Sequence, residues 1–308
     1  MRTNAIIRIV LFSIAIFLLL GILGLGLGVT AFMADFTGEG TGKNTLTGAS
    51  ESNRIPDSGD SETYTCTADP GVIRELEIEW AAGTITIRPS ADADTILVSE
   101  TQLSQEKYQM VCKQSGDTLS IQFCRDSIRF PSLGITADIS KDLLILVPEG
   151  WVCRSLEIDA ASANVDLQDL QIEELDFDGA SGTCDVENCT VGTMDLDAAS
   201  GDVRFCGSLD TLDFDGASAS CTLVLTNCPR HIDLDGMSGD LDLTLPEDCG
   251  FTVEMNAMSS EFSSEFDTKT VNGCHTYGDG SCRISIDAMS GDVILRKGGE
   301  TCHDSHHS

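Results

Sequence analysis

Pairs of aspartates recur at a nearly constant interval in the middle of this 308-residue chain. The clearest pairs occupy equivalent positions in successive repeats: Asp176 with Asp178, Asp195 with Asp197, and Asp213 with Asp215. Carboxylates in this arrangement could do two kinds of chemistry. One pair could supply the acid and the base of a glycoside hydrolase, or successive pairs could form a ladder for calcium, which prefers carboxylate oxygens.

The regularity of the pairs argues against catalysis. A catalytic site singles out one pair, whereas here every repeat has one. Between Leu175 and Gly250 the only lysine or arginine residues are Arg204 and Arg230, and no Ser-His-Asp or Cys-His spacing indicates a nucleophile. We therefore expect no catalytic or cofactor-binding residues and interpret the protein as not an enzyme, with a polysaccharide-active β-helix enzyme as the less favoured alternative.

The aspartate ladder also has a simpler interpretation. Stacked strands lie about 4.8 Å apart, and two carboxylates at that distance repel by about 1 kcal/mol even in water. Such a ladder must be screened, partly protonated or bridged by cations. The chain lacks the glycine-rich nonapeptides of calcium-binding β-rolls, so a solvated face that keeps the protein soluble is favoured. A calcium ladder on the six aspartates named above is the alternative.

Thirteen cysteines all follow the apolar N-terminal segment. Cys274 and Cys282 flank "HTYGDGS", which resembles a hairpin, so they are the best candidates for a disulfide. The lack of any C-x-x-C pair disfavours a zinc site. Four other cysteines fall between repeats, where a disulfide could join neighbouring coils: Cys189, Cys206, Cys228 and Cys249.

The elements that position the aspartates are short strands in a repeat of about 19–21 residues. The repeat is marked by serines spaced by 19, 19, 18, 20, 21 and 31 residues: Ser162, Ser181, Ser200, Ser218, Ser238, Ser259 and Ser290. Apolar residues occupy the positions six and four before each serine and, apart from Ser264, three and five after it. A spacing of two places side chains on one face of a strand. Each repeat therefore supplies two strands with apolar inward faces.

A period near 20 with strand-like content predicts an all-β, parallel β-solenoid. The alternation predicts that Phe177 and Phe214 are buried while Asp178 and Asp215 are exposed. A small residue follows the second aspartate, as at Gly216. It predicts a tight corner where a larger side chain would collide with the coil above or below.

The N-terminus has an uncharged, mostly apolar run from Ile9 to Ala34, and about 20 such residues span a bilayer. Arg2 and Arg8 precede the run and Asp35 follows it. The positive-inside rule then predicts a single-pass anchor in the cell membrane, with the N-terminus cytoplasmic and the rest extracytoplasmic. A cleaved signal peptide is the alternative, because "VTA" at 29–31 resembles a cleavage site.

We divide the chain into four parts: 1–34, a cytoplasmic stub and transmembrane helix; 35–70, a flexible Gly/Ser/Thr-rich linker; 71–298, the β-solenoid, with regular repeats at about 156–297; and 299–308, a disordered tail. The formal net charge of −32 disfavours a nucleic-acid partner, which requires basic patches.

The stretch from about Val72 to Lys297 resembles the bacterial "putative adhesin" domain family, a domain of unknown function. The resemblance lies in the strand pair "LEIEWAAGTITI", the proline-ended strand "DLLILVP" and the repeats "IDLDGMSGDLDL" and "ISIDAMSGDVILRK". It implies a right-handed β-solenoid, often with an N-terminal membrane anchor, and supplies no catalytic residues. The high cysteine content and the dense aspartates depart from the family pattern.

These observations predict a membrane-anchored surface module for adhesion or interaction. Its partners would be the membrane, through the N-terminal helix, and a surface protein or glycan. The alternative is a sensory or regulatory ectodomain of an envelope-stress system, which would use the same anchor and fold.

Overall fold

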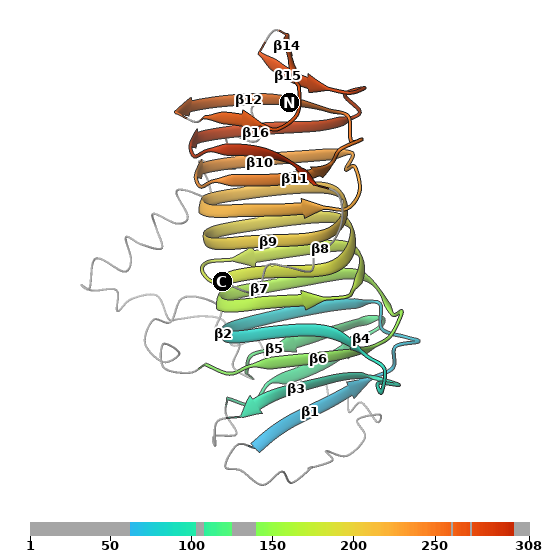
Figure 1. The fold of residues 1–308 in the computed structure, drawn as a ribbon. Coiled ribbons are helices and arrows are strands. Elements are labelled where there is room, and N and C mark those ends of the chain that lie inside the picture. Colours follow the sequence, from blue (N-terminus) through green and yellow to red (C-terminus); the bar gives the residue numbers. More distant parts are fainter. Residues whose placement is uncertain (1–61, 103–107, 125–139, 260, 272, 299–308) are drawn as a thin grey trace, which may run out of the picture. The chain divides into compact units, whose positions relative to one another are not determined.

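The structure is a computed structural model, and it describes residues 62–102, 108–124, 140–259, 261–271 and 273–298. In these residues 17 strands form one hydrogen-bonded sheet (Figure 1). The strands are β1 (Glu62–Ala68), β2 (Glu75–Ser90), β3 (Ile96–Gln102), β4 (Val111–Ser115), β5 (Thr118–Gln122), β6 (Leu143–Pro148), β7 (Val152–Gln168), β8 (Gln171–Gly179), β9 (Thr183–Leu225), β10 (His231–Ser238), β11 (Leu241–Pro246), β12 (Phe251–Ser259), β13 (Phe262–Ser264), β14 (Lys269–Val271), β15 (Cys274–Tyr277), β16 (Cys282–Ser290) and β17 (Val293–Gly298).

The predicted anchor at 1–34 and tail at 299–308 lie outside the described residues. Among the residues that the structure describes, no helix is long and apolar enough to cross a bilayer.

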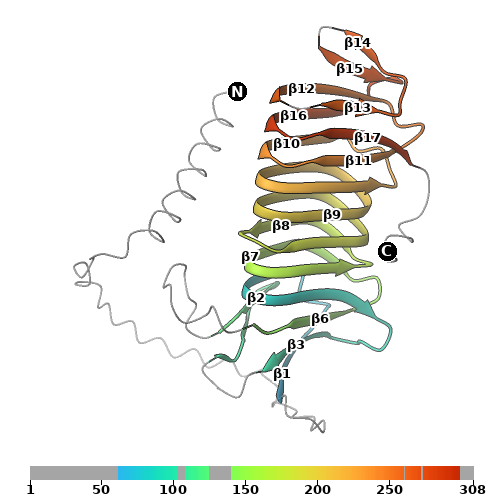
Figure 2. The same ribbon diagram turned by 60° about the vertical axis from the view of Figure 1, so that its left-hand side comes forward.

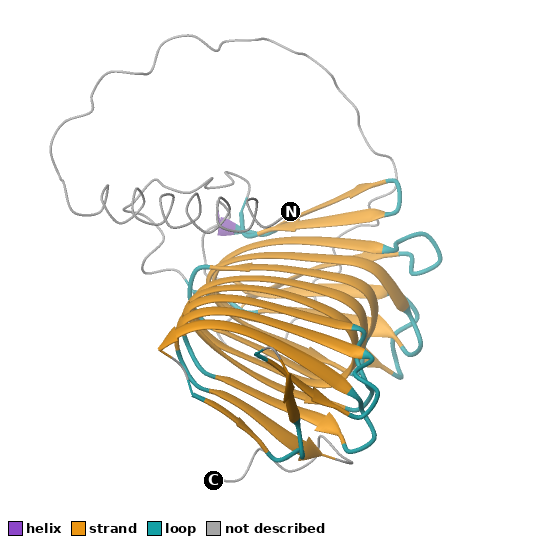
Figure 3. Cartoon of the chain, turned by 90° about the horizontal axis from the view of Figure 1, so that it is seen from above, coloured by secondary structure: helices purple, strands orange, loops and turns teal. Residues whose placement is uncertain are grey.

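The repeats stack as coils through parallel strand pairing (Figure 2). Leu156 of β7 pairs with Leu175 of β8, which pairs with Met194 of β9. These are equivalent positions in successive repeats, so the register that the sequence predicts is confirmed. Seen from above, the strands of successive coils run alongside one another (Figure 3). The chain stays extended through many of its bends, which is why β9 runs for 43 residues.

Alternating side chains build the core between the two walls of each coil. Phe177 and Phe214 are both only 5% exposed, whereas Asp178 is exposed and Asp215 is partly exposed. The predicted inward columns are buried throughout the central coils. Packing loosens toward β12 and β13, where Met255 and other column residues are only partly buried. Period-2 alternation is thus a correct guide to which face is inside.

The order of the coils departs from chain order at the C-terminal end. Ile284 of β16 pairs with Ile232 of β10 on one side and with Val253 of β12 on the other, in parallel both times. β17 lies between β11 and β13 in the same way. The last coil of the chain is therefore inserted between two coils that precede it.

The first coil is inserted similarly. Its strand β2 pairs in parallel with β7 along most of its length. On its other side β2 pairs with β5 and then with β6. The coil at 75–90 thus lies between β5 and β6 on one side and the later coil at 152–168 on the other.

Antiparallel strands cover both ends of the stack. β4 lies on β5, β3 on β6 and β1 on β3 at one end, and β15 lies on β12 with β14 beyond it at the other. β1 falls inside the predicted 35–70 linker, so the boundary at residue 71 was wrong. "ETYTCTA" alternates as a strand does, and its pairing with β3 fixes it. Covered ends matter because an open parallel edge invites aggregation.

Where a glycine follows the bend serine, that glycine is the tight position, rather than the glycine that precedes the serine. Gly201 has φ +122°, and a Cβ built there would lie 1.9 Å from the carbonyl oxygen of Gly182 on the preceding coil. At Gly216, by contrast, a Cβ would meet the ring of Phe214 on the same strand at 2.7 Å. At Gly236 the nearest atom is 3.7 Å away. The predicted collision between coils was therefore placed at the wrong glycine.

An Asp or Asn two positions after a bend serine can join one coil to its neighbour through its side chain. Oδ1 of Asn164 accepts a hydrogen bond from the backbone N–H of Thr183 at 3.1 Å. Asp142 accepts from Thr84 in the same way at 3.0 Å. Asp240 of "SGD" accepts a hydrogen bond from the backbone N–H of Asp292 at 2.9 Å, so an acidic or amide residue at this position can satisfy the backbone of a neighbouring coil.

Candidate functional site

The outward face of the first strand of each coil forms an acidic wall. Strand pairing places equivalent carboxylates side by side on neighbouring coils. Asp178 lies between Asp159 and Asp197, and Asp235 lies between Asp215 and Asp287. We call these six residues the inner column. An outer column runs parallel to it: Glu157, Asp176, Asp195, Asp213 and Asp233. All six aspartates of the predicted ladder therefore lie on this one wall.

The inner column is partly desolvated, which favours its protonated form. Burial, followed by the neighbouring charges of Asp178 and Asp215, raises the pKa of Asp197 to about 7. Burial and the charges of its neighbours, Asp233 first, raise the pKa of Asp235 to about 7. At neutral pH some of these carboxyls therefore hold a proton.

Hydrogen bonds between carboxyls follow from that proton. The side chain of Asp178 is hydrogen-bonded to Asp159 on one side and to Asp197 on the other. Two carboxyls can share a bond only when one of them is protonated. Protons held between these carboxyls make the negative charge of the wall lower than a count of aspartates suggests.

The structure gives no separate sign of a metal centre on this wall. In the described part of the chain, no three His, Cys, Asp or Glu side chains converge closely enough to hold a metal ion. The calcium ladder therefore stays a prediction. Partial protonation is an alternative way to relieve the repulsion between stacked carboxylates.

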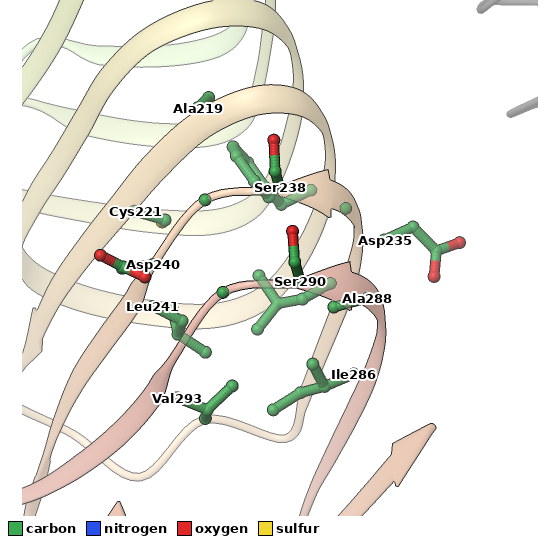
Figure 4. A pocket seen from close by; sticks show the side chains of 15 residues that line it. Ala219, Cys221, Asp235, Ser238, Asp240, Leu241, Ile286, Ala288, Ser290 and Val293 are labelled. Atoms are coloured by element: carbon green, nitrogen blue, oxygen red, sulfur yellow. The ribbon is translucent and has the colours of Figure 1, made fainter. Parts of the chain in front are cut away.

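A small cavity opens beside the wall, at the bends of the coils at 231–246 and 282–298 (Figure 4). It is lined by apolar side chains such as Leu241, Ile286 and Val293, with Ser238 and Ser290 beside them. Its volume of about 40 Å³ holds roughly one water molecule, whereas ligand pockets measure about 300–1,000 Å³. Any partner of this region must therefore bind to the surface.

A buried ion pair that the sequence did not reveal lies at the N-terminal end of the stack. Lys141 is 3% exposed and Glu100 is 1% exposed, and Nζ of Lys141 donates to Oε2 of Glu100. Nζ also donates to the carbonyl oxygen of Tyr108 at 2.7 Å and lies over the rings of Trp80 and Phe123. The only signal in the sequence is a lysine next to the apolar strand "DLLILVP". Such a signal cannot identify a partner 41 residues away.

Desolvation dominates the ionisation of this pair. Burial lowers the pKa of Lys141 and raises the pKa of Glu100, although the pair's own hydrogen bond opposes both shifts. The backbone N–H of Met110 supports Glu100 with a hydrogen bond of 2.7 Å to Oε1. The pair thus joins β3 to the residues just before β6, and its bonds to Tyr108 and Met110 hold the segment before β4 in place.

The predicted disulfide between Cys274 and Cys282 is wrong, because both residues are free thiols. Cys274 lies on β15 and Cys282 on β16, and these strands flank β12 on opposite sides. Two strand spacings separate them by about 9.6 Å, more than the roughly 7 Å that a disulfide spans between Cα atoms. The expected hairpin does not form, because each strand pairs with β12 instead.

A disulfide between neighbouring coils does occur. Cys228 and Cys249 are bonded, with their Cα atoms 5.1 Å apart and a sequence separation of 21. This confirms the expectation that cysteines between repeats could join adjacent coils. Cys206 is also disulfide-bonded, whereas Cys189 is a free, buried thiol.

Comparisons with known proteins give one family match and several similar solved structures. Residues 73–223 match the family model described as "Toastrack DUF4097". None of the curated proteins matches the chain. Among solved structures, a "putative cell adhesion protein" from Clostridium sporogenes is similar at 7% identity and TM-score 0.39, covering 78% of this chain and 100% of its own. A "putative adhesin" from Bacteroides fragilis is similar at 12% identity and TM-score 0.39, covering 76% and 97%. A "putative lipid binding protein" from Parabacteroides distasonis is similar at 14% identity and TM-score 0.35, covering 80% and 98%.

Proposed function

We propose that the chain, whose residues 73–223 belong to the DUF4097 toastrack family, is a membrane-anchored, extracytoplasmic β-solenoid that acts as an adhesion or interaction module without catalysis. Its partner is a surface protein or a glycan. The apolar run from Ile9 to Ala34 supports the anchor. The coils wind in the right-handed sense that parallel crossovers adopt almost without exception.

The observation that carries this proposal is the unbroken acidic wall. From Asp159 to Asp287 the inner column presents the same side chain on each coil. Coils that stack in one direction create extended binding surfaces, and a partner that contacts several coils gains binding free energy from each of them. A wall that repeats one chemical group suits such an extended contact better than it suits a reaction on one bond.

Surface display of the full-length chain tests the proposal. Cells that display it are exposed to a panel of immobilised glycans and surface proteins, and bound cells are counted. The displayed chain should raise binding to at least one partner well above that of cells without it. Replacing Asp178, Asp195 and Asp213 by Asn should reduce that binding at least tenfold.

The matched control removes three charges elsewhere. Glu149, Glu247 and Asp248 lie exposed in turns between coils, and their replacement by Gln, Gln and Asn should leave binding unchanged. Equal losses in both triple variants would show that net charge matters and the wall does not. Release of a product from any glycan would overturn the non-catalytic role, and binding only to a membrane protein of an envelope-stress system would favour the sensory alternative.

A further inference from the structure

Two thiols meet at the N-terminal end of the coil stack, on strands that come from opposite walls. Cys66 lies on β1, which reaches the stack through β3 and β6. Cys112 lies on β4, which pairs with β5. β2 connects the two walls, because it pairs with β5 through Ile78 and with β6 through Ile87. β1 and β4 therefore close the same end from its two sides.

The side chains of Cys66 and Cys112 contact each other between β1 and β4. Both are free thiols of intermediate exposure, and both pack against the hydrophobic core. Their side chains are hydrogen-bonded to each other. A hydrogen bond between two thiols places their sulfur atoms next to each other, as an S–S bond requires.

The surroundings make the two thiols unequal. The hydrogen bond from Cys112 lowers the pKa of Cys66, while the same bond and burial raise the pKa of Cys112. The charges of Glu100 and Lys141 also act on Cys112. Because the thiolate is the nucleophile in disulfide exchange, Cys66 is the attacking group and Cys112 the resolving one.

We propose that Cys66 and Cys112 are a redox-active pair that forms a disulfide across the two walls by exchange with small-molecule disulfides such as oxidised glutathione. The Cys66 thiolate attacks one sulfur of glutathione disulfide, which forms a mixed disulfide and releases one glutathione thiolate. The sulfur of Cys112, after losing its proton, then attacks the Cys66 sulfur and releases the second glutathione. Two protein thiols are oxidised, one glutathione disulfide is reduced to two glutathiones, and the two thiol protons pass to them.

The cross-link would fasten the cap that covers this end of the stack. β1 is held to the rest of the sheet through its hydrogen-bonded pairing with β3. A disulfide to β4 would add a covalent attachment and limit how far β1 can separate from the stack. The oxidised chain should therefore melt at a temperature about 5 °C higher than the chain whose Cys66–Cys112 pair is reduced, because a cross-link restricts the unfolded chain.

Quantitative cysteine mapping of the purified full-length chain tests this proposal. The chain is equilibrated in glutathione buffers of graded ratio, free thiols are blocked with N-ethylmaleimide, and unreduced peptides are analysed by mass spectrometry. A peptide that joins Cys66 to Cys112 should appear, and both thiols should disappear together. Cys112→Ser should instead accumulate glutathione on Cys66, because the resolving thiol is absent.

Cys274 is the internal control. It is a free, half-buried thiol on β15 at the other end of the stack, and it should form only a mixed disulfide. The melting temperature of Cys66→Ser should not depend on the glutathione ratio over the range that shifts the parent. Two results would overturn the proposal: no Cys66–Cys112 peptide at any ratio, or separate glutathione adducts on both residues of the parent chain.

Discussion

The backbone N–H of Asp292 donates a hydrogen bond to Oδ1 of Asp240 at 2.9 Å, across 52 residues of sequence. Asp292 in turn accepts a hydrogen bond from the backbone N–H of Glu261 at 3.3 Å. The two bonds record the insertion of the last coil between the coils at 231–246 and 251–264. A side chain at one bend thus helps to hold a strand that arrives much later in the chain.

The first prediction concerns this bond. Asp240→Ala removes the acceptor and leaves the N–H of Asp292 unpaired, which should lower the free energy of unfolding by about 1 kcal/mol. Asp240→Asn keeps an acceptor oxygen and should cost less than half as much. Denaturant unfolding of both variants measures the difference, with the exposed Asp248→Ala as the neutral control. Equal losses for Ala and Asn would show that the bond is not what holds the bend.

The second prediction separates the two kinds of bend glycine. Gly201→Ala must place a Cβ 1.9 Å from a carbonyl oxygen at φ +122°, so it should destabilise the fold by about 2–4 kcal/mol. Gly236→Ala meets no atom closer than 3.7 Å and should be nearly neutral. Gly216→Val should fall between them, at roughly 1–3 kcal/mol, because the ring of Phe214 can shift. Midpoints of urea unfolding rank the three, and the opposite order would show that the coils separate easily at Gly201.

The third prediction is a pH dependence of stability. The folded-state pKa of Asp197 is about 7, well above the value of about 3.9 in an unfolded chain. A raised pKa stabilises the folded state fully below about pH 4, and this contribution is lost as the pH rises through about 7. Stability should therefore fall from pH 5 to pH 8. Asp197→Asn should flatten that fall and raise the melting temperature at pH 8.

Asp195→Asn is the control for this change, since Asp195 is exposed on the same strand. Its effect on the slope of melting temperature against pH should be smaller than that of Asp197→Asn. A parent protein whose stability rises from pH 5 to pH 8 would show that the inner column is fully ionised in the folded state.

The fourth prediction tests the calcium ladder against the solvated wall. If the wall binds calcium, calcium should raise the melting temperature more than sodium at matched ionic strength does, because a ligand of the folded state stabilises it. Replacing Asp176, Asp195 and Asp213 together by Asn should then abolish the difference. We expect no calcium-specific shift, and we expect the triple variant to melt at or above the parent temperature, because fewer like charges repel. A calcium-specific rise in the parent that the triple variant lacks would establish the ladder.

The sequence by itself determined the coil period, the inward faces and the acidic wall. Alternation in a stretch such as "LDFDG" decides that Phe177 is inside and Asp178 outside, because successive side chains of a strand point to opposite faces. Stacking at one-repeat intervals then brings equivalent aspartates together. These properties depend only on residues within the same repeat or in the adjacent repeat, so the local sequence pattern is enough to predict them.

Only the tertiary structure decided which coils are neighbours and which cysteines meet. The coils at 231–246, 251–264 and 282–298 offer nearly the same strand edge, so no local preference says that β16 lies between β10 and β12. The same holds for the pairing of Lys141 with Glu100 and of Cys66 with Cys112. Each of these contacts joins segments that are far apart in the sequence. No single contact selects their arrangement, because the free energy of packing is distributed over the whole stack.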